Sequence, residues 1–203
     1  SKKNRVGATD DIVFFKMEAG GLFIIQPDTT PHKAEPQIGV SYSVILYEGR
    51  PLVIEVQASR KLPVVKTTKT KTIEVFNKAR ATSLIKMLSY LGVPVNNYDI
   101  FLRAYAPKDV NDEVADLSVI TALLSAFEQF FLPNDTVYLG KVDYDGNILS
   151  TADIDDRLES AHSRGFKKCL SSVDNKNISF KGIENIQIEN IREIIPYFTG
   201  GSG

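Results

Sequence analysis

Four acidic residues precede a long apolar stretch near the middle of the chain, and they are the first candidates for chemistry. Asp109, Asp112, Glu113 and Asp116 lie close together in sequence. Carboxylates at this density could bind a metal ion or act as a general acid and base. An acidic residue directly before an apolar helix is also a common helix cap. We therefore interpret Asp116 as a helix cap and the other three as surface charge.

Nucleophiles are few and lack obvious partners. Ser118 follows the acidic residues but falls inside the predicted helix, where its hydroxyl would bond to the preceding turn. His32 lies in a proline-rich connector and His162 on a helix face, and neither has a serine or cysteine partner nearby in sequence. The single cysteine, Cys169, excludes an internal disulfide and a cysteine-built zinc site. We interpret it as a buried thiol of a cytoplasmic protein without a metal centre.

A run of basic residues is the strongest candidate for binding. Residues 60 to 80 carry seven basic side chains against one acidic residue, Glu74, although the net charge of the whole chain is −1. Interleaved threonines can donate hydrogen bonds to phosphate oxygens, so this segment could follow a DNA backbone without reading its sequence. The alternative is a solvated lysine loop without a ligand. The predicted DNA-binding residues are Arg60, Lys61, Lys66, Lys69, Lys71, Lys78 and Arg80.

Composition narrows the possible functions further. The chain has 203 residues, 43% of them apolar, which is enough for one sizeable core. Its longest apolar runs are strand-sized, far shorter than the ~20 residues of a membrane helix, and no apolar run typical of a signal peptide follows the start. We expect no membrane partner. The chain also lacks the Gly-x4-Gly-Lys-Ser/Thr run of a P-loop, so we expect no nucleotide hydrolysis here.

Apolar periodicity and turn residues predict strands alternating with helices. A hairpin with a glycine turn is predicted from residues 12–15 and 22–25, and a second hairpin from residues 40–47 and 52–58. Between them residues 26–38 form a connector, and residues 60–72 are predicted to be a mobile loop. The predicted helices are 76–91, 117–131, 154–164 and 189–197. The remaining predicted strands are 99–106, 137–142, 148–149 and 167–170. This order indicates an α+β fold with one main core.

Three stretches carry a resemblance to a known family. They read EGRPLVIEVQA at 48–58, EVADL at 113–117 and LESAHSRGFKK at 158–168. In this order they resemble the Lon proteolytic domain, and more specifically the C-terminal Lon-like domain of the bacterial RadA (Sms) DNA repair family. Near the start, KNRVG at 3–7 differs by one residue from the Lys-Asn-Arg-Phe-Gly signature that joins the motor core of that family to this domain.

The resemblance implies a Lon proteolytic-domain-like (ribosomal protein S5 domain 2-like) fold with a small N-terminal β-hairpin extension. The implied organisation is a linker arm at 1–11, a hairpin and connector at 12–38, the Lon-like domain at 39–198 and an appended tail at 199–203. The serine and lysine positions of the Lon dyad fall at Val114 and Asp155. Neither residue can perform the chemistry of a hydroxyl and an amine, so the resemblance implies a pseudo-protease.

The resemblance also implies partners. The domain would be the hexamerisation scaffold and a sequence-independent surface for single- or double-stranded DNA in branch migration, with a RecA-type recombinase as a further partner. Lys3 and Arg5 would contact the nucleotide of a neighbouring subunit, in the manner of an arginine finger. ATP, magnesium and zinc would bind in upstream parts of the parent protein, with no cofactor in this chain. The alternatives are a residual peptidase that uses Ser118 and a protein–protein scaffold without DNA contact.

Overall fold

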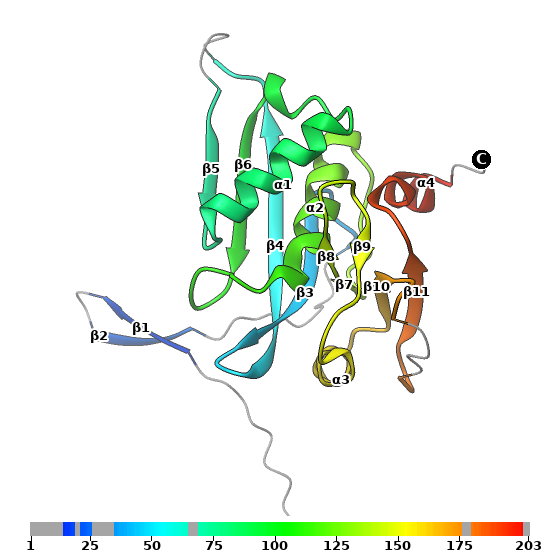
Figure 1. Cartoon of the computed structure of the whole chain (residues 1–203). Coiled ribbons are helices and arrows are strands. Elements are labelled where there is room, and N and C mark those ends of the chain that lie inside the picture. The colour runs from blue at the N-terminus through cyan, green and yellow to red at the C-terminus, as the bar shows by residue number, and fades with distance from the viewer. Residues whose placement is uncertain (1–13, 19–20, 26–34, 65–68, 176–179, 201–203) are drawn as a thin grey trace, which may run out of the picture.

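A seven-stranded mixed sheet forms the centre of the fold in the computed structural model (Figure 1), which describes residues 14–18, 21–25, 35–64, 69–175 and 180–200. The strand order is β11-β10-β7-β3-β4-β6-β5. Strand β4 pairs antiparallel with β3 and β6, and the other four neighbouring pairs are parallel. The strands are β3 (Val40–Tyr47), β4 (Arg50–Lys61), β5 (Lys71–Glu74), β6 (Asp99–Tyr105), β7 (Thr136–Leu139), β10 (Lys168–Ser172) and β11 (Glu184–Ile188).

Strands β3 and β4 alternate between the two faces of this sheet. Ile45, Ile54 and Val56 belong to the larger apolar cluster, which contains residues of α1 (Lys78–Tyr90), α2 (Asp116–Glu128) and α4 (Ile194–Thr199). Val44 and Val53 belong to a second cluster on the opposite face, with α3 (Ile154–Ser163). Figure 1 shows α1 and α2 crossing the sheet, and α3 at the lower end of the molecule. Coverage of both faces explains the uninterrupted apolar run at 52–54, whereas the alternation with Glu55 and Gln57 that follows reflects a face that is only partly covered.

Helix α2 is the central helix, since every residue from Asp116 to Phe127 is buried. It ends at Gln129, which adopts a left-handed conformation and donates its N–H to the carbonyl of Ser125. The prediction that this helix continues to residue 131 was wrong, because this cap ends it before Pro133. Gly39 lies against the same helix with φ +74°, and an added Cβ would be 2.1 Å from the carbonyl oxygen of Ala58. Only glycine fits at this close approach.

Smaller elements complete the fold. The predicted N-terminal hairpin is present as β1 (Phe14–Glu18) paired antiparallel with β2 (Gly21–Ile25). Strands β8 (Lys141–Val142) and β9 (Ile148–Leu149) form a further hairpin. The described residues also contain the short 3-10 turns η1 (Val95–Asn97), η2 (Glu113–Ala115) and η3 (Ile191–Glu193). The architecture is compatible with the predicted α+β class. None of the helices in the described part of the chain has the length and apolar character needed to cross a bilayer.

The sequence prediction missed two edge strands. The predicted loop at 60–72 contains the end of β4 and the start of β5, which pairs in parallel with β6 from Lys71 onwards. At the other edge, β11 was not predicted, and the last helix begins at Ile194 rather than near residue 189. In β5 Ile73 is partly buried while Lys71, Thr72 and Glu74 are exposed, so this strand has little apolar pattern to detect.

Candidate functional site

The two positions that correspond to the Lon dyad lie in different environments. Val114 is in η2, directly before α2, and its side chain is buried in the second cluster, which also contains Val53 and Leu158. Asp155 is in the first turn of α3 and is exposed to solvent. The valine side chain is therefore part of the core that joins η2 to α3, and the aspartate faces away from it.

A largely buried ion pair joins η2 to α3 beside these positions. The guanidinium Nη1 of Arg157 lies 2.8 Å from Oδ2 of Asp112, and the two side chains are 3% and 17% exposed. Arg157 also donates to the carbonyls of Val44 (2.5 Å) and Ala152 (3.2 Å). The interpretation of Asp112 as surface charge was wrong, because its carboxylate pairs inside the fold with Arg157, a residue that was not among the predicted site residues.

Asp112 also holds the backbone around it. Its Oδ2 accepts the N–H of Leu46 at 2.8 Å, and its Oδ1 accepts the N–H of Val114 at 3.1 Å as the cap of η2. One carboxylate thus connects β3, η2 and α3. Because charge-assisted hydrogen bonds are the stronger class, this carboxylate fixes the start of the motif EVADL relative to the helix that carries Asp155.

A second ion pair, partly buried, joins α1 to the start of α2. Nε of Arg80 donates to Oδ1 of Asp116 at 3.1 Å, its Nη2 contacts the other carboxylate oxygen, and the same Nη2 donates to the carbonyl of Val142 at 3.0 Å. Asp116 also accepts the N–H of Val142 at 3.2 Å. Burial raises the pKa of Asp116 above its usual value, although the Arg80 guanidinium opposes the shift. The interpretation of Asp116 as a side-chain cap of α2 was wrong, because that carboxylate binds α1 and β8 instead.

Lys141 and Glu113 extend this network to the surface. Nζ of Lys141 lies 2.5 Å from Oε2 of Glu113, and this contact lowers the pKa of the Glu113 carboxyl. A pocket of about 200 Å³ between α1 and the β8–β9 hairpin is lined by Ser83, Lys141, Tyr144 and others. Within it the hydroxyl of Ser83 donates to the carbonyl of Ala79 in its own helix. The pocket brings a serine and a lysine to one surface, but each has another partner.

Ser118, the alternative nucleophile, is fully buried. Its Oγ lies 2.8 Å from Oγ of Ser41, which also donates to the carbonyl of Ser118. The expected bond to the preceding helical turn is made instead by Thr121, whose hydroxyl donates to Leu117 at 2.7 Å. The Ser118 hydroxyl therefore connects α2 to β3 inside the core. In the described residues no three His, Cys, Asp or Glu side chains gather as metal ligands.

The predicted DNA-binding residues separate into two groups. The guanidinium of Arg60 lies over the rings of Tyr98 and Phe127, at 4.5 and 5.5 Å from their centroids, and its Nε donates to the carbonyl of Ala126 at 3.0 Å. Arg60 and Arg80 thus have internal partners. The exposed members are Lys61, Lys69, Lys71 and Lys78, and Lys66 lies outside the described residues. The two residues predicted to contact a nucleotide, Lys3 and Arg5, lie outside them as well.

The exposed lysines do not form one patch. Lys61 and Lys71 lie on either side of β6, where β4 ends and β5 begins, at the top of Figure 1. Lys78 begins α1 after the far end of β5. Leu62 and Val64, which were not among the predicted site residues, are 69% and 88% exposed beside these lysines. The run Leu-Pro-Val between basic residues was the available signal for them.

Curated proteins similar to this chain are DNA repair proteins. The DNA repair protein RadA of Helicobacter pylori is 30% identical over 173 residues, which are 84% of this chain and 38% of that protein. RadA proteins of Campylobacter jejuni and Rickettsia conorii are 26% and 28% identical over 96% of this chain. The chain spans 38 to 45% of the length of these three relatives, and no family model matches it. These homologues confirm the prediction from the sequence motifs: proteins named DNA repair protein RadA match 84–96% of this chain at 26–30% identity, which is consistent with a C-terminal fragment of a RadA protein.

Proposed function

We propose that this chain is a proteolytically inactive Lon-like domain that serves a RadA-type DNA repair ATPase as a ring-forming scaffold and as a sequence-independent DNA-binding surface. The three motif stretches support this proposal, since they fall on elements that surround the dyad positions. The first covers β4, the second covers η2 and the start of α2, and the third runs through α3 to the start of β10. In the parent protein, Lys3 and Arg5 would contact the nucleotide of the neighbouring subunit.

The chemistry at the dyad positions supports the absence of proteolysis. Hydrolysis of the Lon type needs a hydroxyl activated by an amine that can lose its proton. Val114 has no hydroxyl, and Asp155 is an exposed carboxylate. The basic group nearest to this arrangement in sequence, Arg157, is a guanidinium and not an amine, and it is bound by Asp112. We therefore expect that the purified chain does not cleave a fluorogenic peptide. Any residual cleavage should be the same in the Ser118→Ala variant as in the wild type.

The observation that carries the DNA-binding proposal is the exposed lysine group at the end of β4 and the start of β5, in a chain whose homologues are DNA repair proteins. Lys61, Lys69 and Lys71 present ammonium groups that can bind phosphates without reading bases. Arg60 and Arg80 are occupied within the fold, so we assign the phosphate contacts to the lysines and the packing of the surface to the arginines.

Fluorescence anisotropy with labelled single-stranded and duplex DNA tests this assignment. The triple variant Lys61→Ala, Lys69→Ala, Lys71→Ala should weaken binding and reduce the slope of log K against log salt by up to about 3 for duplex, since each phosphate contact contributes about 0.9. The matched control removes three exposed lysines elsewhere, Lys108, Lys167 and Lys181. If the triple variant binds DNA as tightly as the wild type, the assignment is refuted. If the control variant loses as much DNA affinity as the triple variant, the loss reflects net charge and not these three lysines.

Ring formation is tested separately. Light scattering of the chain at several concentrations should show concentration-dependent assembly if the domain contributes its own interfaces. In the full-length protein, deletion of this domain should cause the hexamer to dissociate. A full-length protein that remains hexameric without the domain would refute the scaffold part of the proposal and leave the DNA-binding part untouched.

A further inference from the structure

The connection between β4 and β5 begins with an exposed apolar segment. Leu62 and Val64 are 69% and 88% exposed, and Pro63 between them fixes the backbone torsion φ. Single exposed apolar side chains are common on protein surfaces and need no explanation by themselves. Here, however, two branched aliphatic side chains flank a proline directly after the end of β4, and this end of β4 lies at the top of the sheet in Figure 1.

The base of this segment is held firmly on both sides of β6. On the β4 side, Arg60 is fixed by its contacts with Tyr98, Phe127 and the carbonyl of Ala126. On the β5 side, the N–H of Thr70 donates to the Asp99 carboxylate at 2.7 Å, and the carbonyl of Thr70 accepts the N–H of Ile100 at 2.9 Å. The apolar segment therefore projects from a rigid support.

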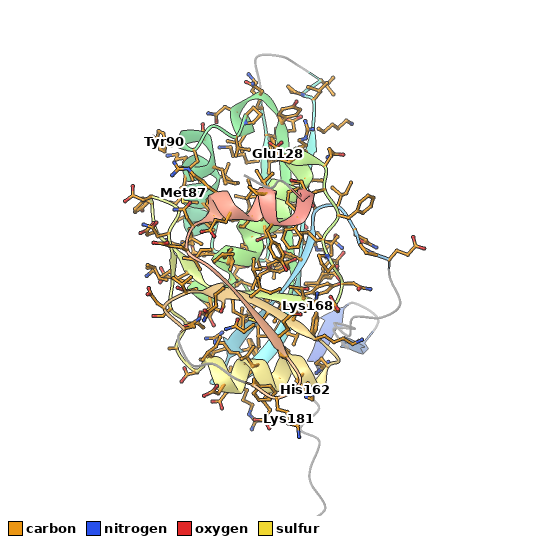
Figure 2. All side chains as sticks on the ribbon, turned by 90° about the vertical axis from the view of Figure 1, so that its right-hand side faces the viewer. Met87, Tyr90, Glu128, His162, Lys168 and Lys181 are labelled. Atoms are coloured by element: carbon orange, nitrogen blue, oxygen red, sulfur yellow. The ribbon has the colours of Figure 1, made fainter. Side chains whose placement is uncertain are left out.

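The charges around the segment favour a polyanionic ligand. Lys61, Lys69 and Lys71 are exposed beside it, whereas the carboxylate of Asp99 is partly buried and occupied by the Thr70 N–H. Glu128, at the C-terminal end of α2, lies toward the same end of the molecule (Figure 2). At this end of the described structure the three lysines thus outnumber the two acidic residues, which leaves a net positive charge beside the apolar segment.

We propose that Leu62, Pro63 and Val64 form an apolar wedge that enters between the bases of DNA, while the lysines beside it hold the phosphates. Aliphatic and proline side chains that enter a base step unstack it, at a cost of about a few kcal/mol. That cost is smaller where stacking is already interrupted, so the wedge should favour forks, nicks and mismatches over continuous duplex. This inference rests on the proposed DNA-binding function, and it adds a base-contacting element to a surface that otherwise contacts only the backbone.

Two kinds of variant separate the wedge from the phosphate contacts. Leu62→Ser with Val64→Ser removes the apolar surface and keeps the lysines, and Leu62→Met with Val64→Ile preserves the apolar character. Tyr144→Ser is the matched control, since Tyr144 is 78% exposed on another part of the surface. Because all of these side chains are exposed, circular dichroism should show that each variant folds like the wild type.

The readout is the fluorescence of 2-aminopurine placed next to a nick or fork, recorded together with anisotropy. We expect the wild type, the Met/Ile variant and the Tyr144 control to raise the fluorescence about twofold or more, because unstacking relieves quenching. The Ser/Ser variant should lose this rise and bind forked DNA about tenfold more weakly, the equivalent of burying part of one aliphatic side chain. Its affinity for continuous duplex and its salt dependence should remain those of the wild type.

The outcomes distinguish the wedge from the proposed function. If the lysine variant loses affinity but 2-aminopurine does not respond to the wild type, or responds equally to the Ser/Ser variant, the wedge is refuted and the DNA-binding surface stands. If the chain binds none of the DNAs, both are refuted. An apolar tip beside lysines could also enter a lipid surface, so vesicles with anionic phosphatidylserine form a further arm. Binding to them that is lost in the Ser/Ser variant, without any 2-aminopurine response, would overturn the wedge.

Discussion

Removal of the Asp112 carboxylate should destabilise the fold strongly, because that group has a buried partner. Asp112→Ala would leave the guanidinium of Arg157, which is 3% exposed, without its counter-ion. Loss of one member of a buried ion pair costs about 3–5 kcal/mol. The N–H groups of Leu46 and Val114 would lose their acceptor as well. We expect a loss of about 4 kcal/mol in the free energy of unfolding.

Substitution of the partner, Arg157, should lower the free energy of unfolding by less than Asp112→Ala does. In Arg157→Met, Asp112 keeps both backbone donors and is 17% exposed, so its charge remains solvated in part, and we expect about 2 kcal/mol. Independent effects would give about 6 kcal/mol in the double variant. We expect about 4 kcal/mol instead, a coupling energy of about 2 kcal/mol, because the second substitution removes the unpaired charge created by the first.

Urea unfolding followed by circular dichroism measures these values by linear extrapolation. If Asp112→Ala does not accumulate as a folded protein, Asp112→Asn is the milder variant: it removes the charge and keeps one side-chain oxygen, which can accept one of the two N–H groups that Asp112 accepts on separate oxygens. The control cycle uses Lys168 and Glu184, an exposed pair at 3.7 Å, for which the coupling should stay below about 1 kcal/mol. A coupling energy for Asp112 and Arg157 no larger than in this control would refute the claim that the pair holds η2 against α3.

Three further predictions follow from single contacts. The Cys169 thiol, whose pKa is raised by burial, should not react with a disulfide reagent in the native chain and should react fully once urea unfolds it; rapid native labelling would contradict its burial. Gly39→Ala should lower the free energy of unfolding by about 2 kcal/mol or more, since the methyl group would meet the carbonyl of Ala58 at a positive φ; an unchanged urea midpoint would contradict this. Glu113→Gln should cost less than about 1 kcal/mol at pH 7, because Lys141 lowers the pKa of this half-exposed carboxyl. Because the pKa of Glu113 is lower in the folded chain, its carboxylate stabilises the fold above the usual pKa of 4.5, and this stabilisation is lost as the pH falls below that value. The difference in unfolding free energy between variant and wild type should therefore vanish in acid. A difference that grows in acid would contradict the ion pair.

The parts of the fold that were predicted are those with a strong local pattern. The alternation over residues 52–58 predicted β4, because one face of this strand is fully buried and the other only in part, and the helical spacing of Leu84, Ile85 and Leu88 predicted α1. Strand β5 escaped prediction because its position depends on backbone bonds to β6, which is distant in sequence. A strand at an edge needs only one partner, so its side chains need not show an apolar alternation.

The site was predictable only in part for a similar reason. The family-like motifs located Val114 and Asp155, but they gave no information about which charges pair. Arg157 and Asp112 are 45 residues apart, and Arg80 and Asp116 are 36 residues apart. A sequence run shows the density of charge and not its partners, so two of the seven basic residues between 60 and 80 were assigned to DNA although their guanidinium groups have internal partners.

The division of the basic run between arginines and lysines has a chemical basis. A guanidinium is planar, weakly hydrated and able to donate several hydrogen bonds at once, so it can lie over Tyr98 and Phe127 or bind the Asp116 carboxylate with two nitrogens. An ammonium group is compact and strongly hydrated, and it remains at the surface. The number of phosphates bound should therefore follow the exposed lysines and not the total basic count. For duplex DNA this predicts a salt slope near −3 to −4, with Lys66 or Lys78 as the fourth contact, where seven contacts would give about −6. A measured slope near −6 would mean that Arg60 and Arg80 leave their internal partners when DNA binds.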